Sequence, residues 1–79
     1  MSPEGEAKLN EIVRSVLQLP SDQDVSRARQ LSVESWDSLA HVSLMLAIES
    51  EFDISIDIAD QIALTSYPSI RLYLEERGA

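Results

Sequence analysis

The segment from Ser38 to Phe52 constrains the fold most, because it is rich in apolar residues and contains neither Gly nor Pro. Its apolar positions are compatible with a helix, and they lie on and around one face: Leu39, Val42, Met45, Leu46 and Phe52. Leu44, Ala47 and Ile48 widen this surface. A helix with so wide an apolar surface packs against several neighbours at once. The segment therefore predicts a central helix.

An amphipathic helix is expected before it, from about residue 3 or 4 to Leu17. Ser2 is a suitable N-cap and Pro3 suits the first turn. Pro20 is expected to end the helix. Its apolar stripe follows helical spacing and comprises Leu9, Ile12, Val13, Val16 and Leu17.

Two helices are expected after the central one. A short helix spans about Asp57 to Ala63, with Asp57 as its cap. The last spans about Tyr67 to Arg77, is capped by Thr65 or Ser66, and is followed by Gly78 as a stop. Its predicted inner stripe is Ile70, Tyr73 and Leu74, and Leu72 falls off that stripe.

The segments between these helices have less regular patterns. Residues 18–37 have no clean period and predict a long loop held to the core by single apolar side chains, namely Val25, Ala28, Leu31, Val33 and Trp36. Phe52, Ile54, Ile56 and Ile58 alternate with polar residues, as in a strand. No partner strand is evident, so we expect an extended connector that buries isoleucines.

The sum is an all-α fold: a small four-helix bundle of three main helices and one short one, with a long loop between the first two. With 79 residues, the sequence allows one domain over residues 1–79 and one core. It contains no cysteine, so disulfides and thiolate metal sites are excluded. We expect a monomer.

The net charge of −8 is unevenly distributed. Between Gln30 and Ile70 there is no Lys or Arg. The acidic residues there are Glu34, Asp37, Glu49, Glu51, Asp53, Asp57 and Asp60. Such a surface disfavours nucleic acid and attracts basic patches on proteins. The plainer alternative is that the acids only maintain solubility.

Membrane insertion and export are not expected. The longest apolar run, 44–48, is far too short to span a bilayer. The first residues have neither a basic region nor an apolar core like that of a signal peptide. We therefore expect a cytoplasmic location.

Catalytic and metal-binding patterns are weak. Asp37, Ser38 and His41 form a conceivable hydrolase set, but one helical turn cannot also supply an oxyanion hole and a substrate cleft. We expect His41, the one histidine, to be a helix-surface residue and the chain not to be an enzyme. Asp53, Ser55 and Asp57 alternate without the rest of a calcium loop, so no metal site is expected.

One helix boundary, Trp36-Asp37-Ser38-Leu39, has two interpretations. The simple one is that Asp37 or Ser38 caps the central helix while Trp36 packs beside it. However, Asp-Ser-Leu opening an apolar helix in a small acidic helical chain resembles the acyl carrier protein family. The resemblance continues through Asp53, includes the connector ending in Ile56, the short helix and the Thr65-Ser66 start of the last helix, and covers roughly residues 8–77.

The resemblance implies a chemistry for Ser38. In this family, a phosphopantetheinyl transferase moves a 4'-phosphopantetheine arm from coenzyme A onto the motif serine, which Ser38 matches. The arm's thiol then holds an acyl group as a thioester. Partner enzymes, such as an acyl ligase, a synthase or an acyltransferase with basic docking patches, supply the catalysis.

Other roles follow from the same resemblance. Asp37 is expected to help bind the transferase or its metal, and Leu39 to contact partners. Glu49, Asp57 and Asp60 are candidate acidic partner contacts. Leu46, Ile58, Ala59 and Ile62 are candidates for a groove that shelters the acyl chain, with ordinary core packing as the alternative for each.

The chain also departs from the family pattern. Ser35 stands where many relatives have Gly, so the turn must avoid a positive φ or be strained there. Trp36 replaces a small residue, and Ala40, Ser43 and Ser50 stand at outward positions where acids are common. These differences favour a specialised carrier over a housekeeping one in fatty acid synthesis. The alternative is an acidic helical adaptor that binds a basic partner without an arm.

Overall fold

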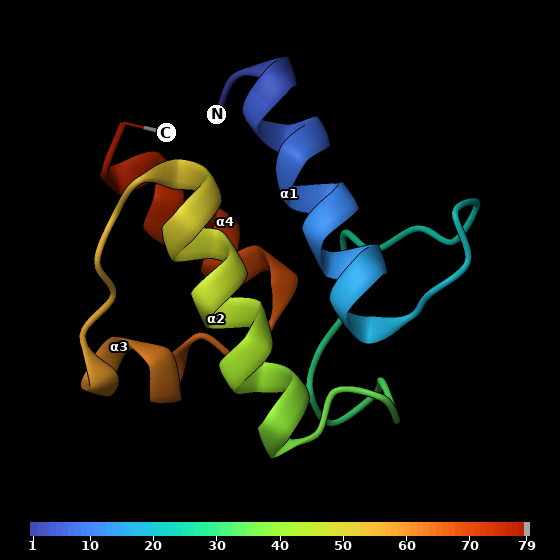
Figure 1. The fold of residues 1–79 in the computed structure, drawn as a ribbon. Helices are drawn as coiled ribbons and strands as arrows, with labels where there is room; N and C mark the ends of the chain where they lie inside the picture. Colours follow the sequence, from blue (N-terminus) through green and yellow to red (C-terminus); the bar gives the residue numbers. More distant parts are fainter. Residues whose placement is uncertain (79) are drawn as a thin grey trace.

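The computed structural model describes residues 1–78 and contains four helices over that range: α1 (Pro3–Leu17), α2 (Ser38–Phe52), α3 (Ile58–Ala63) and α4 (Tyr67–Glu76). Figure 1 shows α2 running beside α1 in the opposite direction, with α4 behind α2 and α3 near its lower part. The start of α1 and the end of α4 lie at the same end of the bundle (Figure 1). The all-α prediction of three main helices and one short helix is confirmed.

The helix starts follow the expected capping chemistry. The Ser2 side chain accepts a hydrogen bond from Gly5 N, and Ser66, not Thr65, caps α4 through a reciprocal pair with Ser69. Asp57 occupies the N-cap position of α3 but makes no side-chain capping bond. The helix starts could therefore be read from the sequence, while the bond expected from Asp57 is absent.

Two helices, α1 and α2, end at a residue with a left-handed backbone conformation. α1 ends because Gln18 adopts φ 55° and its N–H bonds the carbonyls of Arg14 and Ser15. The predicted end of α1 at Leu17 is confirmed, and Pro20 lies two residues beyond the Gln18 cap. Asp53 closes α2 in the same conformation, at φ 52°. Gly78 follows α4 with φ 78°, as expected for a stop.

One hydrophobic core joins the helices and the long loop. Its members are Leu9, Ile12, Val13, Leu17, Val25, Ala28, Trp36, Leu44, Met45, Ile48, Ile56, Leu64, Tyr67, Ile70, Tyr73 and Leu74. The predicted stripe of α4 is buried, and Leu72 is exposed, as expected. No polar or charged side chain is buried among residues 1–78.

The inner face of α2 differs from the predicted one. Leu44, Met45 and Ile48 point into the core. Leu39 and Leu46, which the sequence placed on the main apolar face, are 77% and 60% exposed, and Val42 is also exposed. The exposure of Leu39 agrees with what the family resemblance implied for it. Because apolar residues surround this helix, their spacing alone does not select the buried side.

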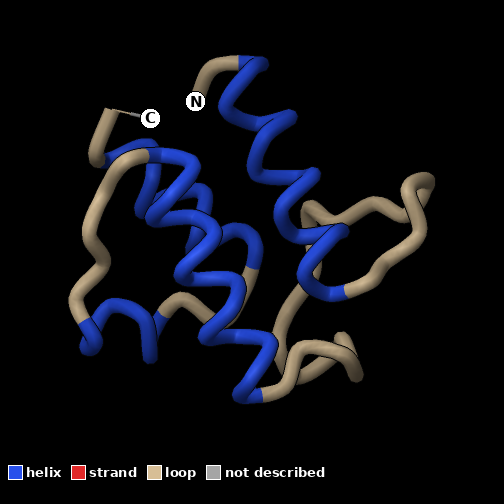
Figure 2. The backbone as a smooth tube through the Cα atoms, viewed as in Figure 1, coloured by secondary structure: helices blue, strands red, loops and turns tan. Residues whose placement is uncertain are grey.

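The loop and the connector are only partly as predicted. Figure 2 shows residues 18–37 as an extended loop without helix, and Val25, Ala28 and Trp36 fasten it to the core. Leu31 is 96% exposed, so its expected anchoring role is wrong. In the connector Ile56 is buried and Ile54 half-buried.

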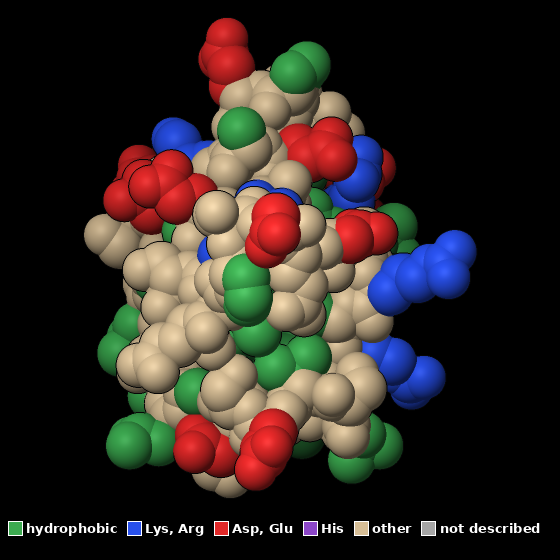
Figure 3. Space-filling model, turned by 90° about the vertical axis from the view of Figure 1, so that its right-hand side faces the viewer, with side chains coloured by type: hydrophobic (Ala, Val, Ile, Leu, Met, Phe, Trp, Pro, Cys, Tyr) green, Lys and Arg blue, Asp and Glu red, His purple; other side chains and the backbone are tan. Residues whose placement is uncertain are grey.

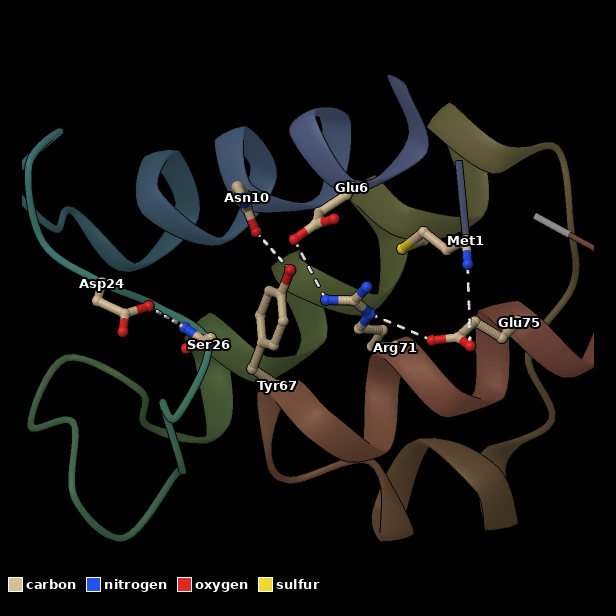
Figure 4. Close-up of polar contacts among 8 residues, drawn as sticks. All are labelled: Met1, Glu6, Asn10, Asp24, Ser26, Tyr67, Arg71 and Glu75. Carbon is tan, nitrogen blue, oxygen red and sulfur yellow. Dashed lines mark hydrogen bonds and ion pairs between the residues drawn. The ribbon is translucent and has the colours of Figure 1, made fainter. Parts of the chain in front are cut away.

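Polar contacts fasten α4 to α1. Tyr67 donates its hydroxyl proton to Asn10 Oδ1, and Arg71 pairs with Glu6 at 3.2 Å and with Glu75 at 3.1 Å (Figure 4). Burial, reinforced by the nearby Glu6 carboxylate, raises the pKa of Tyr67. The Asn10 and Glu6 contacts join α4 to α1 at the surface of the core, whereas the Glu75 pair lies within α4.

Candidate functional site

Ser38 is exposed at the first position of α2. Asp37, immediately before it, is the N-cap: its Oδ1 accepts a hydrogen bond from Ala40 N at 2.8 Å. The first backbone bond of the helix runs from His41 N to Asp37 O. Asp37 rather than Ser38 therefore performs the capping, and the Ser38 hydroxyl is not used for it.

The start of α2 suits an anionic group. The N–H groups of Ser38 and Leu39 precede the first intrahelical bond and have no partner within the helix. The positive end of the helix dipole lies at the same place. A phosphate attached to Ser38 Oγ would meet free donors and a favourable potential. The residues present therefore fit a phosphopantetheine attachment.

Three consecutive residues before Ser38 are each held by a hydrogen bond, one to the end of α1 and two to α2. Ser35 Oγ donates to Leu17 O at 2.6 Å, at the end of α1. Trp36 is 2% exposed and donates its indole N–H to His41 Nδ1 at 3.0 Å. Asp37 caps α2. Ser38 is thus an exposed residue on a well-anchored segment.

The backbone at Ser35, where many family members have glycine, does not adopt a positive φ. Among residues 1–78, the non-glycine residues with positive φ are Gln18 and Asp53, so Ser35 avoids the strained region. A glycine would give the turn conformational freedom, whereas Ser35 connects the turn to the Leu17 carbonyl at the end of α1 through a hydrogen bond.

His41 is half-buried, and the prediction of a helix-surface role is wrong. Its Nδ1 faces the Trp36 indole, its Nε2 lies 2.6 Å from Gln61 O on α3, and the two rings stack with centroids 6.1 Å apart. Because both ring nitrogens already have partners, neither is available to activate Ser38. The geometry therefore opposes the hydrolase alternative.

An open apolar surface lies next to the exposed serine. Leu39, Val42 and Leu46 follow one stripe along α2, and Ile58 and Ile62 are 75% and 72% exposed on α3. Ala59 is exposed as well. Core packing, the alternative for the four groove candidates, is wrong for all of them. Their role toward an acyl chain stays a prediction.

The candidate acidic contacts have different environments. Asp57 is exposed, whereas Glu49 is half-buried and its Oε2 accepts a hydrogen bond from Ile56 N at 2.8 Å. Asp60 lies 3.9 Å from the Arg77 guanidinium. Glu49 therefore has a structural role that the sequence did not reveal: its side chain links α2 to Ile56 in the connector that follows. Docking roles for these three acids remain predictions.

The charges are separated over the surface. The basic residues of α1 and the long loop are Lys8, Arg14, Arg27 and Arg29. Arg71 belongs to α4, and Arg77 is the C-cap residue that follows it. Figure 3, which views the molecule from the right-hand side of Figure 1, shows basic side chains projecting from one edge of this face and others beside acidic side chains in its upper part. α2 and α3 carry no Lys or Arg.

Other classes of site find no support in the described residues. Over residues 1–78 there is no cluster of three or more His, Cys, Asp or Glu side chains that could hold a metal ion. Within the same range, no helix is long and apolar enough to cross a membrane.

Comparison with known proteins places this geometry in a class. No protein-family model matches the chain. It is 38% identical over 55 residues to acyl carrier protein 4, chloroplastic, and to acyl carrier protein 1, chloroplastic, both from Cuphea lanceolata. The match covers 70% of this chain but only 40% and 39% of the lengths of these relatives.

The all-helical fold agrees with the small bundle expected of an acyl carrier protein. The similarity to these relatives supports the resemblance to the acyl carrier protein family. The family name describes a carrier, which agrees with the prediction that the chain is not an enzyme. The relatives are chloroplastic by name, so the predicted cytoplasmic location stays a prediction.

Proposed function

We propose that the chain carries acyl groups on a 4'-phosphopantetheine arm attached to Ser38. The observation that supports this most directly is the combination of an exposed Ser38, a separate cap at Asp37 and free N–H groups at the start of α2. The carrier itself performs no catalysis, and residues 1–79 act as one carrier domain.

Ser38 acts as the nucleophile when the arm is attached. Its Oγ forms a bond to the β-phosphorus of coenzyme A, the pyrophosphate P–O bond breaks, and adenosine 3',5'-bisphosphate leaves. The hydroxyl proton passes to a base of the transferase or to water. His41 is not that base, because its nitrogens are engaged by Trp36 and Gln61. The attached arm supplies a thiol that holds the acyl group as a thioester.

The surface around Ser38 suits a partner that offers both apolar and basic contacts. Leu39, Val42 and Leu46 offer apolar contacts beside the serine, and the region from Gln30 to Ile70 offers acids without bases. Asp37, Glu49, Asp57 and Asp60 would meet basic patches on a transferase, ligase, synthase or acyltransferase. α2 has few acids along its length, so apolar contacts contribute relatively more, as in a carrier with dedicated partners in fatty acid or polyketide biosynthesis.

The test is attachment of the arm in vitro. The protein is incubated with coenzyme A and a broad-specificity phosphopantetheinyl transferase, and its intact mass is measured. The wild-type protein gains the mass of one phosphopantetheine. Ser38→Ala gains nothing while keeping its helical circular dichroism, and Ser43→Ala, a second exposed serine on the same helix, is modified like wild type.

Absence of the added mass from wild type would refute the carrier proposal. It would favour the adaptor alternative, in which the acidic bundle binds a basic partner without an arm. In that case, Ser38→Ala would bind the partner as well as wild type does.

A further inference from the structure

One contact joins the segment before the proposed attachment serine to the short helix α3. Trp36 lies two residues before Ser38 and donates its indole N–H to His41 Nδ1, and His41 Nε2 lies 2.6 Å from Gln61 O on α3. Since His41 is three residues after Ser38, the ring bridges the two elements next to the serine. The general requirement for an exposed serine does not explain such a bridge.

α3 depends on contacts of this kind. None of its own residues is buried, and Asp57 makes no side-chain cap. The buried anchors are Ile56 before it and Leu64 after it. The 3.9 Å contact between Asp60 and Arg77 connects it to α4 at the surface. His41 supplies the hydrogen bond that connects α3 to α2.

The bridge requires one form of the ring. Nδ1 accepts a hydrogen bond from the Trp36 indole N–H, which can only donate, so Nδ1 carries no hydrogen. Nε2 faces a carbonyl oxygen, which only accepts, so it carries the hydrogen. Loss of Nδ1 as an acceptor would leave the indole N–H of a 2% exposed tryptophan without its partner.

We propose that His41 is a positioning residue that holds α3 and the Trp36–Ser38 segment in one relative arrangement, so that the phosphopantetheinyl transferase meets both as one surface. This inference rests on the proposed attachment at Ser38. It assigns to His41 a role in the recognition of the carrier, while the chemistry remains with Ser38 and the transferase.

Two variants separate the two sides of the bridge. His41→Phe keeps an aromatic ring beside Trp36 but removes both hydrogen bonds. His41→Asn places an amide oxygen near the position of Nδ1, so it can still accept from Trp36 but is too short to reach Gln61 O. Ser43→Ala is the matched control, because Ser43 is an exposed residue two positions further along α2.

The experiment measures KM and kcat of the transferase for each carrier, together with the fluorescence of Trp36, the sole tryptophan. We expect His41→Phe to raise KM several-fold with kcat nearly unchanged and to shift the Trp36 emission. His41→Asn restores the wild-type emission but keeps the raised KM, because the link to α3 is still absent. Ser43→Ala matches wild type in both measurements.

Two results would overturn the inference: a wild-type KM for His41→Phe, or a wild-type KM for His41→Asn. Nitrogen NMR of the wild-type imidazole provides a test that needs no variant, since a hydrogen on Nδ1 in the folded protein at neutral pH contradicts the bridge. Failure of the carrier proposal looks different, because the wild-type protein would then not be modified at all.

Discussion

Replacing Asp37 separates its two proposed tasks, capping α2 and attracting the transferase. In Asp37→Ala, Ala40 N loses the acceptor that lies 2.8 Å away. Loss of an N-cap side chain costs about 1 kcal/mol, and the exposed position of Asp37 gives no reason for the upper end of the range. For a domain of this size, about 1 kcal/mol lowers Tm by roughly 4–8 °C.

Asp37→Asn is the matched variant. Its amide oxygen keeps the cap, and only the favourable charge at the helix start is lost, which is worth about 0.3–1 kcal/mol. Asp37→Asn should therefore unfold at a temperature between those of wild type and Asp37→Ala, because only Asp37→Ala loses the cap as well as the charge; circular dichroism follows the unfolding. If the carboxylate also attracts the transferase or its metal, both variants should show slower modification of Ser38.

Equal loss of stability in Asp37→Asn and Asp37→Ala would refute the capping argument. Unchanged stability in Asp37→Ala would refute it as well. Normal modification of Asp37→Asn would leave the cap intact but remove the proposed contact between the Asp37 carboxylate and the transferase.

Three further predictions concern the anchors, the core and alkaline pH. Ser35→Ala removes the hydrogen bond to the Leu17 carbonyl and should lower the free energy of unfolding by about 0.5–1.5 kcal/mol in urea titration; no change would show that the bond contributes nothing. Leu44→Ala should cost about 2–5 kcal/mol, whereas Leu39→Ala, at an exposed position, should stay within about 0.5 kcal/mol of wild type; equal losses would contradict the assigned inner face of α2. Burial raises the pKa of Tyr67 and of Tyr73 above 10.0, the value for an exposed side chain, so the unfolded state releases these protons first and stability should fall as pH rises beyond about 10; stability that rises there would contradict the burial of both rings.

The sequence predicted α2 more accurately in extent than in orientation. Asp37 as a capping residue and the uninterrupted run after it are local features, so the bounds Ser38–Phe52 were predicted correctly. The buried side was not, because Leu39 and Leu46 are as apolar as Leu44. Packing of the long loop and the neighbouring helices decides which leucine is buried, and helical spacing does not contain that information.

In the candidate site, too, local features could be predicted from the sequence but long-range contacts could not. Ser38 and its resemblance to a family motif were visible in the sequence, as was its place at a helix start. The bridge through His41 was not, because it depends on Gln61, which lies 20 residues away along the chain. The tie from Ser35 to Leu17 likewise crosses 18 residues. Trp36 and His41 on either side of the cap were the available indication, but their spacing does not fix which ring atoms meet.

The central claim, that Ser38 holds the arm, is tested most directly by locating the modification. The protein treated with coenzyme A and transferase is digested, and the peptides are sequenced by tandem mass spectrometry. We expect one phosphopantetheine per chain, on Ser38, with the other exposed serines of α2, Ser43 and Ser50, unmodified. An arm on another serine, or no arm on any peptide, would contradict it.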